Sequence, residues 1–114
     1  MDIVFTIDGV DVPARMKDTG AARDFVSLLP LTLSLTDYAS SEKIADLPRK
    51  LSTDADPPGT DARPGDICYY APWGNLALFY MPAPYAEGLI TLGALPQAIE
   101  VLRRKGPLPT TIRI

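Results

Sequence analysis

The chain has 114 residues, of which 46% are hydrophobic and 22% charged, and its formal net charge is −3. This length suits one domain with its own core, so we expect a single domain over residues 1–114. The acidic balance argues against a nucleic-acid partner, because contact with phosphates requires an excess of basic side chains. No apolar run approaches the ~18 residues of a membrane-spanning helix, so no membrane contact is expected.

Cysteine use and the N-terminal residues bear on the compartment. Cys68 is the only cysteine, which rules out an internal disulfide and fits a reducing environment. The first residues lack the basic and apolar regions of a signal peptide. We therefore expect a cytoplasmic location. The 12 prolines are expected in loops and at the starts of elements.

The N-terminal residues predict a β-hairpin. Apolar and polar residues alternate over 3–7 and again over 10–17, on either side of Asp8-Gly9. Alternating runs joined by Asp-Gly are a strong hairpin signal. Pro13 falls on the polar face, which favours an edge strand or a bulge at that position.

A short helix and a half-buried strand follow the hairpin. The helix is predicted over about 20–28, with Asp18 or Thr19 as its N-cap and Pro30 at its end. Leucines alternate with Thr and Ser over 31–36, which predicts a strand with its leucines facing inward.

The middle of the chain combines a short strand with a long loop. A strand is predicted over 42–48. Residues 49–65 are polar and rich in Pro and Gly, so we expect a surface loop that is too polar to pack. A loop of this length is typically functional or mobile.

A second hairpin and another strand come next. Residues 67–71 and 76–81 form the predicted arms of the hairpin, joined by the four residues 72–75. A strand is predicted over 89–94, in which Gly93 permits a bulge or a close approach of two backbones.

The C-terminal region predicts a helix and a final strand. The helix starts at Pro96, a favoured first position. Its basic residues 103–105 suit the negative end of the helix dipole, and Gly106-Pro107 ends it. The last strand is predicted over 108–114.

These elements predict a mainly β fold. Strands and helices do not alternate, so a parallel α/β sheet is not expected. A short chain with this many strands must protect its sheet edges, and closure is the direct way to do so. We therefore predict a small closed β-barrel of seven to eight strands, with two short helices that cap its ends.

Several kinds of chemistry are excluded by what the sequence lacks. There is no histidine, which removes the usual catalytic triads and histidine-ligated metals. The acidic residues Asp54, Asp56 and Asp61 do not have the spacing of a calcium-binding EF-hand. Cys68 has no cationic neighbour in sequence to activate it. We expect no metal and no cofactor, and we assign no catalytic residue.

The second hairpin is unusually aromatic. Its aromatic residues are Tyr69, Tyr70, Trp73, Phe79 and Tyr80. Adjacent rings on one strand point to opposite faces, so some must lie near the surface. They either form an apolar groove for a peptide or small molecule, or pack across the strands and cover a barrel end.

Polar candidates precede this hairpin in the chain. Tyr38, Glu42 and Lys43 follow the strand with Thr and Ser on one face. They either supply polar contacts to a ligand or form a surface ion pair. The candidate ligand-binding residues are Tyr38, Glu42, Lys43, Trp73, Asn75 and Tyr80.

Four segments together resemble the small prokaryotic cyclophilin-like proteins. They are 22–38, 42–51, 65–80 and 88–93, and the most distinctive stretches read EKIADLP and PWGNLALFY. The resemblance covers nearly the whole chain and implies a cyclophilin-type β-barrel with two helices. The biochemical role of that family is not established.

The resemblance transfers no catalytic residue. Cyclophilins are prolyl isomerases whose arginine follows a Phe-His pair on a barrel strand, whereas the matching strand 31–36 has neither Arg nor His. A non-catalytic domain that binds a peptide or small ligand is therefore the first hypothesis. The alternative is a divergent prolyl isomerase using Arg15 or Arg23. A protein-binding subunit with an exposed aromatic patch is a third.

Overall fold

The computed structural model describes residues 1–96 and 99–114, which contain ten strands and two helices. The strands are β1 (Asp2–Ile7), β2 (Val10–Met16), β3 (Leu31–Tyr38), β4 (Glu42–Asp46), β5 (Gly59–Ala62), β6 (Asp66–Tyr70), β7 (Asn75–Phe79), β8 (Ala83–Glu87), β9 (Leu89–Ala94) and β10 (Leu108–Arg113). The helices are α1 (Gly20–Val26) and α2 (Ile99–Leu102).

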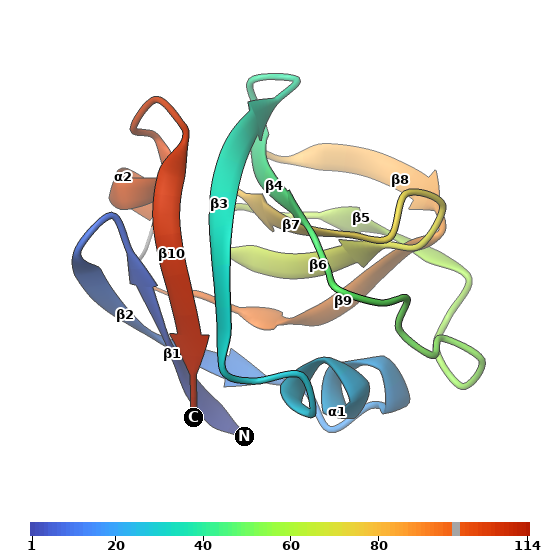
Figure 1. Cartoon of the computed structure of the whole chain (residues 1–114). Helices are drawn as coiled ribbons and strands as arrows, with labels where there is room; N and C mark the ends of the chain where they lie inside the picture. The colour runs from blue at the N-terminus through green and yellow to red at the C-terminus, as the bar shows by residue number, and fades with distance from the viewer. Residues whose placement is uncertain (97–98) are drawn as a thin grey trace.

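Eight of the strands form a closed antiparallel barrel in the order β1-β10-β3-β4-β7-β6-β9-β2, which confirms the predicted fold class (Figure 1). The first hairpin is as predicted. Asp8 and Gly9 both have positive φ, 49° and 84°, as a two-residue hairpin turn requires. Ile3, Phe5 and Ile7 point into the core and are almost fully buried.

The barrel closes where β2 meets β9. The closing pairs are Arg15 with Ala94 and Met16 with Gly93, so Pro13 lies on a strand edge as predicted. A Cβ atom added to Gly93 would lie 2.4 Å from the carbonyl oxygen of Arg15, and the β6–β9 register shifts beside Gly93. Both predictions for this glycine, a close approach and a bulge, are confirmed.

The two helices add apolar side chains to the barrel core. The hydroxyl of Thr19 accepts a hydrogen bond from the N–H of Ala22 at 3.3 Å, which identifies Thr19 as the N-cap of α1. Phe25 of α1 and Leu102 of α2 are fully buried in the core. The predicted start of the second helix reaches residues 97–98, which lie outside the described residues.

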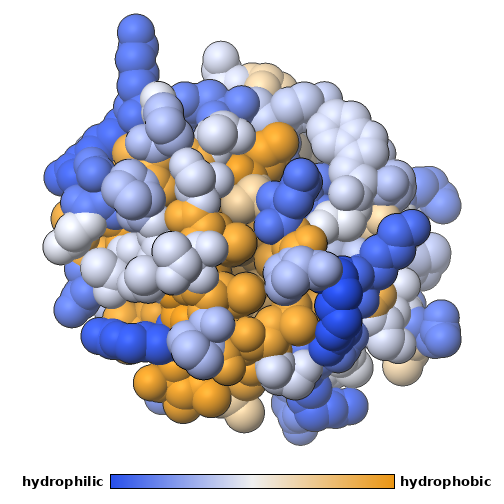
Figure 2. Space-filling model, in the orientation of Figure 1, coloured by the Kyte–Doolittle hydropathy of each residue, from blue (hydrophilic) through white to orange (hydrophobic). Residues whose placement is uncertain are grey.

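The pairing between β3 and β4 covers only the end of β3. The two strands pair from Thr36 to Tyr38 on β3, whereas the first part of β3 pairs with β10. The leucines of β3 alternate as predicted, but Leu31 and Leu33 are only half-buried. Figure 2 shows apolar side chains at the surface of this face of the molecule.

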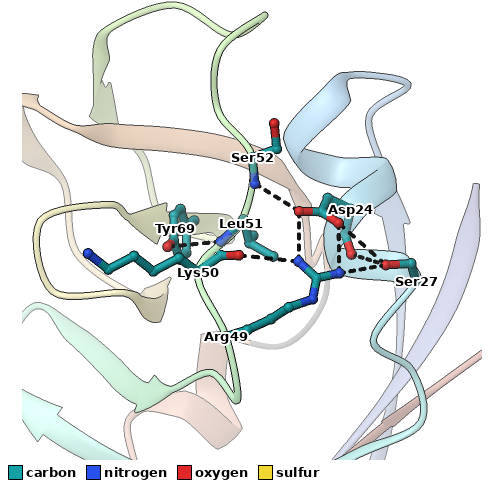
Figure 3. A network of polar contacts seen from close by, with 7 residues as sticks. All are labelled: Asp24, Ser27, Arg49, Lys50, Leu51, Ser52 and Tyr69. Carbon is teal, nitrogen blue, oxygen red and sulfur yellow. Dashed lines mark hydrogen bonds and ion pairs between the residues drawn. The ribbon is translucent and has the colours of Figure 1, made fainter.

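The expectation that residues 49–65 form an unpacked loop is wrong for its first part. The guanidinium of Arg49 donates to both carboxylate oxygens of Asp24 on α1, at 2.8 and 2.9 Å (Figure 3). The N–H of Ser52 donates to the same carboxylate at 2.8 Å. Leu51 is buried, and its N–H donates to the hydroxyl of the core residue Tyr69 at 3.1 Å.

The end of the predicted loop is also ordered, because β5 pairs with β8 in a two-stranded ribbon outside the barrel. This ribbon encloses a second apolar cluster against the outer face of β6, β7 and β9. Its buried members are Ala62, Cys68, Ala77, Phe79 and Leu89. β7 is therefore covered on both faces, and all five of its residues are buried.

Candidate functional site

A groove of about 320 Å³ lies on the outer face of the barrel, between the β4–β7 pair and the ribbon strand β8. Its walls come from the end of β3 and the turn after it, from β4, β6, β7, β8 and the start of β9, and from the loop between β6 and β7. The lining residues with large or polar side chains are Tyr38, Ser41, Glu42, Ile44, Tyr70, Trp73, Asn75, Phe79, Tyr85 and Leu89.

The strand register determines which side chains reach this groove. Leu76 and Leu78 of β7 point into the barrel core, so Asn75 and Phe79 point outward. On β6 the same alternation buries Tyr69 in the barrel and turns Tyr70 outward, opposite Asn75.

An aromatic wall forms around Trp73, a residue that is 55% exposed. Its ring meets that of Tyr38 edge-to-face, with centroids 5.3 Å apart and an interplanar angle of 88°. It meets the ring of Tyr70 in the same manner at 5.4 Å and 82°. Such pairs each contribute roughly 0.5–1.5 kcal/mol beyond burial. The exposed indole is thus held in position by two neighbours.

Asn75 lines the groove and carries a hydrogen-bond acceptor without a partner. The residue is 2% exposed, and its Nδ2 donates to the carbonyl of Leu76 at 3.0 Å. Within the described chain, its Oδ1 is the one buried side-chain nitrogen or oxygen without a hydrogen-bond partner. Leaving such an atom unsatisfied costs about 1–3 kcal/mol, and a native structure retains few of them.

Glu42 is the charged residue of the groove. Its side chain is half-buried, and this burial raises the pKa of the Glu42 carboxyl above its ordinary value. A hydrogen bond from the hydroxyl of Ser41, at 3.5 Å, acts in the opposite direction. Among the described residues that line the groove, none is a lysine or an arginine.

Four of the six candidate binding residues line this groove: Tyr38, Glu42, Trp73 and Asn75. The structure separates Lys43 and Tyr80 from them. Lys43 follows Glu42 directly on β4, so its side chain points to the opposite face, into the barrel, where it is fully buried. A ligand contact of Lys43 beside Glu42 is therefore contradicted by the geometry.

Lys43 instead belongs to a cluster at the mouth of the barrel. Its ammonium forms an ion pair with the carboxylate of Asp37 and lies 5.5 Å from the ring centroid of Tyr80. Asp37 also accepts a hydrogen bond from the N–H of Gly106 at 2.9 Å. Both hydrogen bonds lower the pKa of Asp37, and the one from Lys43 has the larger effect. Lys43 thus forms an ion pair, but with Asp37 in place of its neighbour Glu42, and its ammonium is buried and not at the surface as predicted.

The sequence reasoning missed one wall of the groove. Ala83, Pro84, Tyr85 and Ala86 of β8 line it, and Tyr85 is 57% exposed. These residues lie in none of the elements predicted from the sequence, and Pro82 and Pro84 interrupt the apolar–polar alternation there. Two prolines are compatible with an edge strand, and that was the available signal.

Two other candidates have no reactive arrangement. Cys68 is buried under the ribbon, and burial raises the pKa of its thiol to about 12, so it is protonated and inert at neutral pH. Residues 1–96 and 99–114 contain no group of three acidic or cysteine side chains that could hold a metal ion. Neither described helix has the length and apolar character that crossing a membrane requires.

The chain is similar to one family of proteins and to several solved structures, two of which follow. The model of the cyclophilin-like family matches residues 5–113. The hypothetical protein AF2241 from Archaeoglobus fulgidus superposes with a TM-score of 0.67 at 13% identity, over 99% of this chain and 93% of that one. McbB in complex with tryptophan superposes with a TM-score of 0.67 at 20% identity, over 97% of this chain and 44% of McbB. No curated protein sequence matches the chain.

Proposed function

The chain belongs to the cyclophilin-like family, and we propose that it is a non-catalytic binding domain that holds a small ligand in the groove beside Trp73. The observation that carries this proposal is the unpartnered Oδ1 of Asn75 in a mainly apolar groove with aromatic walls. A few placed polar groups in a concave apolar surface are the usual composition of a small-molecule site.

The size of the groove favours a small molecule over a long peptide. Its volume of about 320 Å³ lies at the lower end of the range for small-ligand pockets, ~300–1,000 Å³. The structural neighbour McbB was solved with tryptophan, a molecule of suitable size, and this supports a small ligand here as well.

The alternative, a divergent prolyl isomerase, needs an arginine beside the bound proline. Arg15 and Arg23 do not line the groove, and their guanidinium groups pair with Asp2 at 3.2 Å and Asp18 at 2.6 Å on exposed surfaces. No contact of either residue favours the isomerase. An exchange assay on a Xaa-Pro peptide, with high protein concentration, would detect any activity.

The binding proposal is tested with Trp73 as a reporter, because it is the single tryptophan of the chain and lies in the groove. A panel of non-fluorescent small metabolites is titrated while the emission of Trp73 and the backbone amide NMR shifts are recorded. A binder is expected to change the emission and to shift amides of β4, β7 and β8.

The variant Trp73→Ala should weaken that binding, whereas Val10→Ala should not. Val10 is an exposed apolar residue that does not line the groove, so it serves as the matched control. Shifts that cluster on another face, or binding unaffected by Trp73→Ala, would contradict the proposed site.

A further inference from the structure

Two acceptors of the groove, on Glu42 and Asn75, favour a ligand that donates hydrogen bonds. This inference rests on the proposed binding function and specifies the class of ligand. Glu42 offers a carboxylate and Asn75 an unpartnered carbonyl oxygen, and both are acceptors. No lysine or arginine among the described lining residues balances the carboxylate. An anionic ligand would therefore meet repulsion.

The register places the two acceptors at opposite ends of the groove. Glu42 pairs with Phe79, whereas Asn75 pairs with Asp46, four residues further along β4. Four residues of an antiparallel strand span about 13 Å. The outward-facing Ile44 and Phe79 provide apolar lining in this region. A ligand that reaches both acceptors must therefore be elongated, with an apolar middle and a donor at each end.

The two ends differ in character. Asn75 lies opposite Tyr70, whose ring packs against Trp73, so a flat ring at this end has aromatic neighbours. At the other end Glu42 is half-buried beside Ser41. Burial disfavours the charged carboxylate, and a bound cation would restore that charge by pairing with it.

We propose that the groove selects elongated arylalkylamines, in which an alkyl chain joins an aromatic ring to an amine. A ring N–H would donate to Oδ1 of Asn75, and the ammonium group would pair with Glu42. The neutral donor satisfies the unpartnered acceptor, and the cation satisfies the half-buried carboxylate. The aromatic rings of Tyr38 and Trp73 favour the same ligand, because ring faces attract a flat π-system and a cation alike.

The test compares three indoles that carry the same alkyl chain at C3, ending in an ammonium, a hydroxyl or a carboxylate group, with chains of two to six carbons. Affinity is measured by calorimetry at pH 7, and the binding face by amide NMR. At the best chain length we expect the amine to bind on the order of tenfold more tightly than the alcohol, and the acid to bind most weakly. Methylation of the ring nitrogen should cost the amine a similar factor, because the donor to Asn75 is lost.

Glu42→Gln keeps the shape of the side chain and removes its charge, so the preference for the amine over the alcohol should disappear. The matched control is Glu87→Gln, which removes a carboxylate from exposed β8 outside the lining and should keep the preference. Amide spectra of both variants confirm that each is folded.

The outcomes separate the two proposals. Equal binding of all three probes at the groove, or tightest binding of the acid, would overturn the proposal that the ligand is an arylalkylamine. The proposal of a binding groove would remain in place. Absence of any shift at β4, β7 and β8 would overturn the arylalkylamine class, and if the metabolite panel also failed there, the proposed binding function would fall as well.

Discussion

At the scale of single residues, Asn75 and Lys43 are both buried polar side chains, but they differ in how they are satisfied. Asn75 keeps an acceptor without a partner on the outer face of β7. Lys43 is paired with Asp37 inside the barrel mouth. A residue kept at a cost to stability is a candidate for function, whereas a paired one is explained by packing.

Replacing Asn75 with leucine should separate stability from binding. Asn75→Leu removes the unsatisfied Oδ1 from the buried face, so the free energy of unfolding is expected to stay within about 1 kcal/mol of wild type or to rise. Ligand affinity should fall. Urea denaturation and calorimetry measure the two quantities, and a loss of more than about 2 kcal/mol in stability would indicate a structural role for Asn75.

Lys43→Met should have little effect on stability and none on the groove. The substitution leaves Asp37, whose side chain is 46% exposed, to be solvated by water. Removing one partner of an ion pair is costly when the charge left behind is buried, but Asp37 is exposed to water, so we expect a change within about 1 kcal/mol. The measurement is urea denaturation. Because Lys43 faces away from the groove, a tenfold loss of ligand affinity in this variant would contradict the placement.

At the scale of elements, closure of the barrel depends on a glycine. β2 and β9 pair through Arg15 and Met16, where the backbone of β9 comes too close for a side chain at Gly93. The alternation of β2 and the position of Gly93 in β9 were both readable from the sequence. The partner strand was not, because it is contributed by a segment about 80 residues away in the chain.

Gly93→Ala should therefore weaken the closure. Its Cβ would lie 2.4 Å from the carbonyl oxygen of Arg15 and 2.9 Å from Cα of Met16, so one backbone has to move. The expected loss is about 1–3 kcal/mol in the free energy of unfolding, measured by urea denaturation.

Gly20→Ala is the matched control for this substitution. Gly20 begins α1, and its Cβ would make ordinary contacts of 3.6 and 3.7 Å. We expect no loss, or a gain of about 0.4–1 kcal/mol from the lower entropy of the unfolded chain. Equal effects of the two substitutions would show that close approach at Gly93 is not the cause.

At the scale of the whole molecule, the segment around Arg49 connects three parts of the fold. Asp24 of α1 binds Arg49 and the N–H of Ser52, and Leu51 between them binds the core hydroxyl of Tyr69 (Figure 3). These contacts lower the pKa of Asp24 from 3.8 to about 2, with the Arg49 hydrogen bond as the largest cause and that of Ser52 second.

The sign of the pH dependence follows from that shift. A carboxyl with a depressed pKa contributes stability above its unfolded pKa and loses it as pH falls toward the folded value. The free energy of unfolding should decrease as pH falls from about 4 to about 2. Asp24→Asn should lower stability at pH 7 by about 1 kcal/mol and flatten this part of the profile. An unchanged profile, measured by urea denaturation at each pH, would contradict the role of Asp24.

The sequence by itself determined the elements that depend on local chemistry. The Asp8-Gly9 turn, a helix cap at Asp18 or Thr19, the leucine alternation of β3 and the four-residue loop holding Trp73 follow from neighbours in the chain. It also predicted four residues of the groove, because Tyr38, Glu42, Trp73 and Asn75 belong to polar or aromatic stretches with no obvious core position.

Only the tertiary structure decided which face of each strand meets the groove. A shift of one residue in register turns every side chain of a strand to the opposite face. The local sequence does not determine whether Glu42 or Lys43 points outward. The local sequence likewise does not determine which of Tyr69 and Tyr70 faces the groove. Nor does it determine that β8 pairs with β5 or that Leu51 is buried. These features depend on contacts between distant segments, whose energies the local sequence pattern does not contain.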